Sequence, residues 1–465
     1  MGAGTHATPM VEWINHAGFL LECGSVSLVC DPWLSGTAFN GGWRLMSDSV
    51  FGPDDFSRVT HIWFSHQHPD HFAPSDLRRI PAQTRARITV LYHPTIDKKV
   101  VRFCKSLGFK AQIELTDRDW YPLDEDVALK CGVWFDRDSW LAIRTPQGTI
   151  LNANDCVIDS RTLARQIVRK TGPVRLLLTQ FSYADYQGDP QDVERQVASA
   201  RDKLERIMAQ ADVFDPEMIV PFASYMFWCK PENFHLNFEM NRASKVAQFI
   251  EERLRRTPIV LYPGERWRLG EQRDWSESAA RYDRDIAEKL DHGPSEVSTS
   301  VPLEALQRAA SHFLVRLRKR NPLLFLTWGR STRIHLYDLA VSLRISHRKL
   351  RLISAHENVD IEMHSESLLF CLKTPWGSNA LAANGRFRSP HGRHERFFVF
   401  FKPADWADHG YRLSVSMLPL LIGAAIVRAY ALLARRFEAD RGRIVVPVAT
   451  PSVSTAAPPI VRQEP

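Results

Sequence analysis

The sequence predicts an α+β protein that begins with an αββα sandwich, in which two β-sheets pack face to face and helices cover their outer faces. Apolar, β-branched runs bounded by Gly, Pro and polar residues are typical of strands. They fall into two sets with helical segments between them, the longest being a charged stretch at about 190–211. The predicted strand segments are residues 11–32 (two strands joined by a Gly-Ser turn), 59–68, 88–94, 127–135, 139–155, 174–181 and 217–224.

The pattern along the chain predicts four segments. We expect the sandwich to occupy residues 1–290 and the polar stretch 291–302 to be a linker. From 303 to 440 the pattern changes to helix, several strands and helix, which predicts a smaller α+β accessory domain. The last segment, 441–465, is rich in Pro, Ser, Thr and Ala, and this composition predicts disorder.

The composition narrows the class of protein. A formal charge of +7 over 465 residues is too diffuse to predict nucleic-acid binding, and it favours anionic small molecules or an acidic partner protein. Part of the charge is concentrated between Arg316 and Arg351, where ten Lys or Arg residues stand against the single acid Asp338. This segment is either a solvated basic face or a dock for an anionic partner.

Seven scattered cysteines without a C-x-x-C pair favour a reducing, cytoplasmic compartment and argue against a disulfide scaffold. The most apolar run, residues 413–427, contains Pro419 and Gly423 and is short for a bilayer span. We expect it to be a buried helix, and we predict no membrane span.

One short stretch, "HIWFSHQHPDHF" at 61–72, carries four ligand-type residues directly after an apolar strand. His66 and His68 are two residues apart, so they can point to the same side of an extended loop and bind one metal ion. Asp70 and His71 follow the chain-bending Pro69 and are expected to face a second ion. The spacing therefore predicts a metal site.

"SHQHPDH" resembles the H-x-H-x-D-H signature of the metallo-β-lactamase fold, an αββα sandwich with a binuclear metal site at one edge. The resemblance covers roughly residues 10–270. It implies that Asp31 in "LVCDPWL" is a supporting aspartate and that Asp155 in "ILNANDC" is the carboxylate shared by both metals.

Three longer stretches, "NHAGFLLECGSVSLVCDPWLSGTAFNGGW", "NANDC" and "PFASYMFWCKPENF", are most similar to the metallo-β-lactamase-like part of the CMP-sialic-acid hydroxylases. In those enzymes a Rieske domain precedes this part. The present sequence has no cysteine–histidine pairs that could build one, so the resemblance does not carry the sialic-acid substrate with it.

Hydrolases of this fold complete the first metal site with a third histidine upstream of the shared aspartate, but this chain has no histidine between His93 and His235. We expect a carboxylate there instead. The first site is then His66, His68, Asp155 and Asp138, with Asp136 as the alternative to Asp138. Less favoured candidates are Asp124, Glu125 and Asp126, and closure by water or His93 is the remaining alternative.

The second site is expected to hold Asp70, His71 and Asp155 together with His235 from "KPENFHLNF", with Glu232 in reserve. His16 is either a donor near the metals or a core histidine. Tyr183 and Tyr186 either line the substrate pocket or pack in the core.

Replacing an imidazole by a carboxylate adds negative charge and a hard oxygen donor, which favours iron over zinc. A small group of diiron monooxygenases of this fold is similar in this respect. The resemblance implies two iron ions, O2 as co-substrate, Asp70 and Asp155 as catalytic residues, and hydroxylation of a small-molecule or natural-product intermediate. With no nucleotide, flavin or cluster motif in the sequence, the electrons must come from an external ferredoxin or reductase.

The alternative is a binuclear zinc hydrolase of a phosphoester, lactone or amide, in which Asp70 would orient the attacking hydroxide.

In the accessory domain, residues 357–388 predict paired strands and faintly resemble sterol-carrier-like modules. That resemblance implies an apolar cleft for an acyl or terpenoid part of the substrate, or a homodimer interface. The other interpretation is a packing domain that covers one side of the active site.

Overall fold

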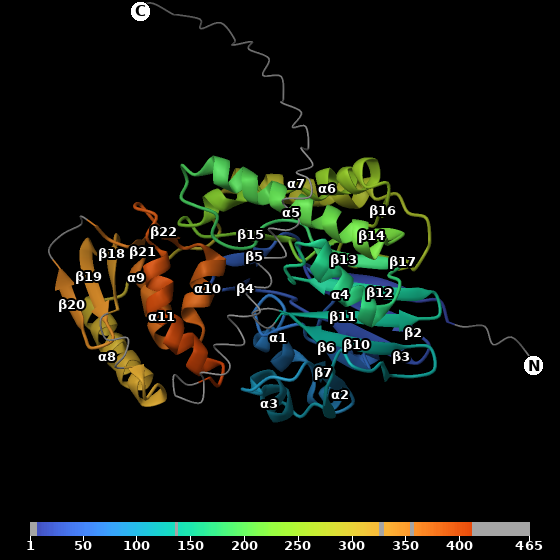
Figure 1. The fold of residues 1–465 in the computed structure, drawn as a ribbon, viewed down its shortest axis with the longest axis horizontal. Coiled ribbons are helices and arrows are strands. Elements are labelled where there is room, and N and C mark those ends of the chain that lie inside the picture. Colours follow the sequence, from blue (N-terminus) through green and yellow to red (C-terminus); the bar gives the residue numbers. More distant parts are fainter. Residues whose placement is uncertain (1–6, 135–137, 325–329, 354–357, 412–465) are drawn as a thin grey trace, which may run out of the picture. The chain divides into compact units, whose positions relative to one another are not determined.

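The structure is a computed structural model. It describes residues 7–134, 138–324, 330–353 and 358–411 (Figure 1). The helix expected at 413–427 and the tail expected at 441–465 lie outside these ranges. Among the described residues, no helix combines the length and the apolar character that crossing a bilayer requires.

Two seven-stranded sheets form the sandwich (Figure 1). The first has the strand order β17-β1-β2-β3-β6-β7-β8 and the second the order β16-β14-β13-β12-β11-β10-β9. The first sheet consists of β1 (Met10–Asn15), β2 (Gly18–Cys23), β3 (Val26–Cys30), β6 (His61–Trp63), β7 (Thr89–Tyr92), β8 (Ala111–Glu114) and β17 (Arg266–Arg268). The second consists of β9 (Tyr121–Pro122), β10 (Ala128–Val133), β11 (Ser139–Thr145), β12 (Gly148–Asn154), β13 (Leu176–Gln180), β14 (Met218–Phe222) and β16 (Thr257–Pro258).

The alternation of side chains along the strands separates the two faces of the first sheet. Leu21 and Leu28 enter the core between the sheets, whereas their neighbours Leu20 and Val29 enter a second cluster on the outer face. Helices α1 (Pro74–Arg79) and α3 (Lys99–Ser106) contribute to that outer cluster, and α2 (Ala82–Arg85) and the 3-10 helix η1 (Pro53–Arg58) lie in the same part of the chain.

Helices also cover the outer face of the second sheet. There α5 contacts β13 and α6 contacts β14, and α4 packs on α5 while α7 packs on α6. The predicted αββα arrangement is therefore confirmed. These helices are α4 (Arg161–Thr171), α5 (Val193–Phe214), α6 (Ala243–Gln248), the π-helical η4 (Phe249–Arg253) and α7 (Ser276–His292).

The prediction of two strands at 11–32 was wrong, because β1, β2 and β3 divide that segment. The extra turn lies at His16 and Ala17, between β1 and β2. His16 adopts a left-handed backbone (φ 41°), which is uncommon for a non-glycine residue and allows the strand to reverse there.

The remaining elements form a small three-stranded sheet and the C-terminal part of the chain. A three-stranded sheet has the order β15-β5-β4, and a five-stranded sheet has the order β20-β19-β18-β21-β22. Their members are β4 (Thr37–Ala38), β5 (Trp43–Leu45), β15 (Met226–Trp228), β18 (Ser331–Leu336), β19 (Val341–Ser346), β20 (Leu350–Ile353), β21 (Ile361–Met363) and β22 (Phe387–Arg388). The accompanying helices are η3 (Phe234–Asn237), α8 (Leu303–Arg320), α9 (Ser365–Lys373), α10 (Gly377–Asn384) and α11 (Glu395–Asp408).

The prediction of paired strands at 357–388 is confirmed in part: β21 and β22 pair antiparallel, but two helices, α9 and α10, lie between them where only a turn was expected. The buried apolar residues of α9, Leu368, Cys371 and Leu372, follow a spacing of three and four. This spacing is typical of one face of a helix and outweighs the turn suggested by Pro375 and Gly377.

The carboxyl ends of parallel strands from both sheets lie at one edge of the sandwich. In the first sheet β3, β6 and β7 are parallel, and in the second β12, β13 and β14 are parallel. A hydrogen bond from Asn154 Nδ2 to Asp31 Oδ2 (2.6 Å) joins the end of β12 to the end of β3. Such edges are where polar side chains can gather without disturbing the core.

Replacing Gly132 by alanine tests the packing between β10 and β11. A Cβ atom at Gly132 would lie 2.2 Å from Cζ2 of the buried Trp140, its cross-strand partner. We expect Gly132→Ala to lower the free energy of unfolding by about 1–3 kcal/mol. Chemical denaturation would measure this, with Gly52→Ala as the control, since its nearest contact would be 3.8 Å. Equal stability of the two variants would contradict this packing.

Candidate metal centre

Three overlapping groups of ligand-type side chains lie at the edge where the strands end. In each group the donor atoms are within 4.8 Å of one another. The groups share members, so they form one cluster, which we call the edge cluster. The three groups are His66, His68 and Asp138; His66, His71 and Asp155; and His16, Asp70 and His71.

The first group combines the loop after β6 with the turn before β11. His66 Nε2 lies 2.8 Å from His68 Nδ1 and 3.8 Å from Asp138 Oδ1. The backbone N–H of Trp134 donates to the Asp138 carbonyl (2.7 Å), so Asp138 sits at the base of the β10–β11 turn. The expected carboxylate therefore reaches the two histidines. Asp136, the alternative, lies outside the described residues.

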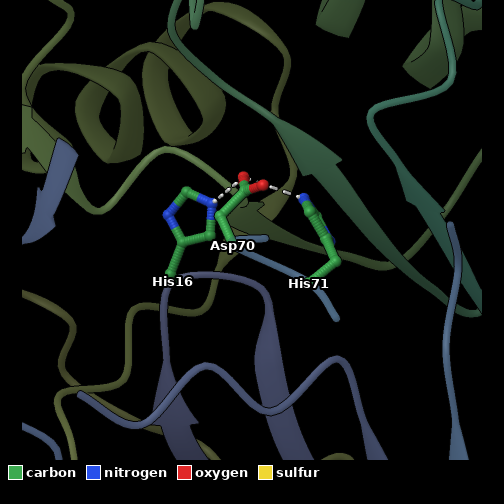
Figure 2. Close-up of side chains that lie close together, drawn as sticks. All are labelled: His16, Asp70 and His71. Atoms are coloured by element: carbon green, nitrogen blue, oxygen red, sulfur yellow. Dashed lines mark ion pairs between the residues drawn. The ribbon is translucent and has the colours of Figure 1, made fainter. Parts of the chain in front are cut away.

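The other two groups meet at His71. Its Nε2 lies 3.2 Å from Asp70 Oδ2 and 3.3 Å from Asp155 Oδ2. Figure 2 shows that His16, from the turn between β1 and β2, faces the same Asp70 carboxylate, with 3.3 Å between Nε2 and Oδ2. His16 is 1% exposed, and its Nδ1 is buried without a hydrogen-bond partner.

One carboxylate oxygen of Asp155 faces the cluster, and the other accepts a hydrogen bond that holds the side chain in place. Gln180, the last residue of β13, donates from Nε2 to Asp155 Oδ1 (3.0 Å), and the Lys203 ammonium donates to the Gln180 side-chain oxygen. The second oxygen, Oδ2, lies between His71 Nε2 and His66 Nε2, at 3.3 and 3.9 Å. This is the orientation a carboxylate shared by two groups would need.

A second layer of hydrogen bonds orients the imidazoles. Asp31 accepts from the backbone N–H of Ser65 (2.7 Å) and lies 3.1 Å from His71 Nδ1. Ser65 Oγ lies 2.9 Å from His66 Nδ1, and Ser139 Oγ donates to the Ser65 carbonyl (2.6 Å). A partner on Nδ1 leaves Nε2 of His71 and of His66 directed into the cluster.

Charge and burial shift the pKa values of the cluster in opposite directions. Burial opposes ionisation of Asp70, but His71 and His16 outweigh it and hold the pKa of that carboxyl well below its usual range. Burial also opposes charging of His71, yet Asp70 and Asp155 hold its pKa well above the usual imidazole value. Burial, together with the charges of His71 and His68, keeps the pKa of His66 well below that value.

The edge cluster fits a bound cation. Asp70 Oδ1 and His16 Nδ1 are buried and lack hydrogen-bond partners in the structure, and such atoms are costly to leave unmatched. Three carboxylates, those of Asp70, Asp138 and Asp155, converge with the imidazoles. Mixed nitrogen and oxygen donors of this kind suit a divalent transition metal.

Residues 10–125 match the family model of the beta-lactamase superfamily domain. The N-terminal part of the chain thus carries a beta-lactamase superfamily domain. This confirms the family expected from "SHQHPDH", and the sheet order and the position of the edge cluster agree with it.

Curated relatives of this superfamily domain include two kinds of protein. The chain is 34% identical over 107 residues to a putative Rieske 2Fe-2S iron-sulfur protein of Mycolicibacterium smegmatis, over 23% of this chain and 20% of the relative. It is 29% identical over 155 residues to the cytidine monophosphate-N-acetylneuraminic acid hydroxylase of Xenopus laevis, over 31% and 25%. A putative Rieske protein of Mycobacterium tuberculosis is 26% identical over 243 residues, 49% and 46% of the two chains. The chain thus spans less than half the length of these relatives.

Solved structures similar to the chain carry both oxygenase and hydrolase names. One is CmlA, a diiron beta-hydroxylase from Streptomyces venezuelae, at 16% identity and a TM-score of 0.39, covering 57% of this chain and 55% of that one. Another is Igni18, a metallo hydrolase from Ignicoccus hospitalis, at 14% identity and a TM-score of 0.37, covering 57% of this chain and 100% of that one.

The structure does not bring His235 to the edge cluster, and this part of the expectation needs correction. His235 Nε2 lies 3.1 Å from the Gly188 carbonyl. Asn237 anchors the short helix η3 by accepting from the Trp228 N–H and donating to the Trp228 carbonyl, which turns His235 towards residue 188. The reserve candidate, Glu232, pairs with Arg386 instead (3.3 Å).

The remaining candidates have internal roles. Tyr183 donates to the Leu236 carbonyl (2.7 Å), and Tyr186 donates to Asp189 (2.6 Å). Both rings are buried, as in the packing alternative. Asp124 accepts from Ser25 and Val127 in a turn, and neither it, Glu125, Asp126 nor the buried His93 belongs to the three groups among the described residues.

Metal binding is expected to release about one proton per chain near pH 7, because the raised pKa of His71 keeps its imidazole protonated in the metal-free protein and a metal must displace that proton. His66, with its lowered pKa, is already neutral. Affinity should fall about tenfold per pH unit below the folded pKa of His71. Isothermal titration calorimetry in buffers of different ionisation enthalpy measures the released protons. Uptake without proton release would contradict this assignment.

The same shifts set the pH dependence of the metal-free fold. The raised pKa of His71 means that its stabilising contribution is present below the ordinary imidazole pKa and is lost as pH rises through the folded value. The depressed pKa of Asp70 contributes above the ordinary carboxyl pKa and is lost as pH falls through its folded value.

Proposed function

We propose that the chain is a diiron monooxygenase that hydroxylates a small-molecule or natural-product intermediate. The observation that carries this proposal is Asp138 beside His66, where hydrolases of the fold place a third histidine. A carboxylate at this position favours iron over zinc because it is a hard, anionic donor. The hydroxylase name of the Xenopus laevis relative supports the same reaction class.

The edge cluster supplies ligands for two ions. His66, His68 and Asp138 would hold the first, and Asp70, His71 and His16 the second. Asp155 would contribute to both, because it faces His66 and His71 while Gln180 supports it from the other side of its carboxylate. Asp31 and Ser65 would act by fixing the imidazoles of His71 and His66 in the required tautomer.

A bound pair of iron ions supplies the redox chemistry that O2 activation needs. Hydroxylation of one C–H bond by O2 consumes two electrons and two protons and yields the alcohol and water. The seven cysteines are buried free thiols, so we assign the electrons to an external one-electron donor such as a ferredoxin or reductase. The Rieske names of the mycobacterial relatives support a donor of this type.

The protein's own contribution is orientation and exclusion of water. Trp33 packs edge-on against His16 at 5.6 Å between ring centroids, and Phe39 packs in the same way against His68 at 5.5 Å. Both aromatic side chains are nearly fully buried. These apolar rings lower the local dielectric constant next to the cluster, and a lower dielectric constant strengthens the electrostatic interactions of its carboxylates.

A binuclear zinc hydrolase is the second candidate, and one observation favours it. Asp70 is held ionised by His71 and His16, while its Oδ1 is buried without a hydrogen-bond partner. That oxygen could accept a hydrogen bond from an attacking water and orient it towards a phosphoester, lactone or amide. The same metal analysis separates the two candidates.

Full-length protein expressed with iron and zinc both available should contain about two irons per chain, because the carboxylate-rich ligand set favours iron. Plasma mass spectrometry measures the metals. An optical spectrum taken during anaerobic reduction and O2 readmission should show a charge-transfer band that bleaches and then returns. Two zincs and a featureless spectrum would overturn the oxygenase and support the hydrolase.

The matched variant is Asp138→His, which restores the imidazole that hydrolases of the fold use. It should shift the bound metal from iron towards zinc, because the first site then has three nitrogen donors. An unchanged iron-to-zinc ratio in Asp138→His would show that Asp138 does not determine the metal.

Paired variants test the assignment of His16. We expect His16→Ala to lose about one of the two metal equivalents, because a buried imidazole that faces Asp70 is removed. His235→Ala should keep both, since His235 faces the Gly188 carbonyl. Metal content and circular dichroism of the purified variants are the measurements. The reverse pattern would restore His235 as the ligand.

A further inference from the structure

We propose that the C-terminal α+β part of the chain belongs to the metal centre, with Asn384 and Arg386 as positioning residues. They hold the turn Phe39–Asn40–Gly41 so that the Phe39 ring packs against His68. This inference rests on the proposed function in one respect, namely that His68 binds a metal ion. It assigns to residues more than 300 positions away in the sequence a part in shaping that site.

The turn is strained by itself. It joins β4 to β5, and its three residues have φ values of 50° (Phe39), 57° (Asn40) and 69° (Gly41), all in the left-handed region. This region is disfavoured for residues other than glycine, less so for Asn40 than for Phe39. Hairpin turns often contain two such residues in succession, but Asn and Gly are favoured there and Phe39 is not, so contacts from outside the turn help to hold Phe39.

The contacts that hold the turn come from the end of α10. Asn384 Nδ2 donates to the Phe39 carbonyl (2.8 Å), and Arg386 Nη1 donates to the Asn40 carbonyl (2.8 Å). The approach is so close that a Cβ atom on Gly42 would lie 2.5 Å from that of Asn384. Asn233 closes the contact by donating to the carbonyls of Gly42 (3.1 Å) and Asn384 (2.6 Å).

Arg386 is itself fixed in place. Its side chain is 0% exposed, and Nη2 donates to Glu366 (2.5 Å), Ser298 (2.8 Å) and Glu232 (3.3 Å). A buried guanidinium with two carboxylate partners has little freedom to move. The donor to Asn40 is therefore rigid.

The turn delivers one side chain to the edge cluster. The ring of Phe39 packs edge-on against the imidazole of His68, with centroids 5.5 Å apart and an interplanar angle of 66°. The Trp43 ring also packs edge-on against Phe39, with centroids 4.4 Å apart. Because Phe39 is 3% exposed, its ring restricts rotation of the His68 imidazole.

A second contact from the C-terminal part reaches the same loop. Gln67, which lies between His66 and His68 in sequence, is 2.9 Å from His409 Nε2 through its side-chain nitrogen. His409 Nδ1 lies 2.7 Å from the Asp405 carbonyl, so Nδ1 carries the proton and Nε2 accepts from Gln67. The C-terminal part thus contacts the metal loop at Gln67, in addition to holding the turn whose Phe39 ring packs against His68.

The test uses the full-length protein loaded with cobalt(II), whose visible spectrum reports the geometry of its ligands. Asn384→Ala should weaken binding of one of two cobalt ions about 10-fold to 100-fold, the range expected when support behind a ligand is lost. The absorption of that cobalt should change as well. Thermal denaturation is measured in parallel.

The matched control is Asn321→Ala in the same part of the chain. Asn321 Nδ2 also donates to two backbone carbonyls, those of Leu317 (3.0 Å) and Pro403 (3.3 Å), and is equally buried, but it belongs to none of the contacts with the turn or the metal loop described above. It should lower the melting temperature while leaving cobalt affinity and spectrum unchanged. An Asn384→Ala variant that behaves like Asn321→Ala would overturn the proposal.

Should Asn384→Ala fail to fold, Phe39→Leu replaces it, because it keeps the turn and removes only the aromatic ring. A changed cobalt spectrum in Phe39→Leu supports the proposal, and a wild-type spectrum overturns it. Wild-type protein that takes up no cobalt would overturn the proposed metal function together with this inference. Wild-type protein with two cobalt ions, matched by both variants, would overturn this inference alone.

Discussion

The carboxylate of Asp31 is the interaction on which the rest of the site depends. It is fully buried at the end of β3, where an anion must be matched by donors or it destabilises the fold. Its partners are the backbone N–H of Ser65, the Asn154 amide and the His71 imidazole. These donors come from both sheets, so satisfying one buried charge fixes the distance between β3, the loop after β6 and the end of β12.

From that fixed point the electrostatics of the edge cluster follow. Asp70, Asp138 and Asp155 place three carboxylates at a partly buried edge of the sandwich. In the metal-free protein the proton on His71 offsets only part of their negative charge. Bound cations would complete the balance, since a ligand that binds only the folded state stabilises it by mass action. Stability and metal occupancy should therefore be coupled in this protein, and the coupling is strongest at His71, where proton and metal compete for one nitrogen.

The sequence alone was sufficient to predict the ligand residues that lie in one loop. It was insufficient for the residues whose position depends on tertiary contacts. His66, His68, Asp70 and His71 share one loop, so their spacing was enough to predict their meeting. The place of His16 depends on a turn between β1 and β2 that the strand pattern hid. His235 was expected among the ligands, but Asn237 anchors η3 and His235 contacts the Gly188 carbonyl. Neither effect leaves a periodic signal in the sequence.

Backbone strain gathers around the same site, and this explains why distant residues matter there. His16, Asp31, Phe39, Asn40 and Asn154 all have positive φ without being glycine. Each is held from outside its own element, as when the Ala223 N–H donates to the His16 carbonyl or Asn384 donates to Phe39. A ligand placed by strained backbone is only as accurate as the contacts that enforce the strain. In the proposed function one side chain, Asp138, would determine the metal, whereas contacts remote in sequence, such as that of Asn384 with Phe39, would determine how accurately the ligands are placed.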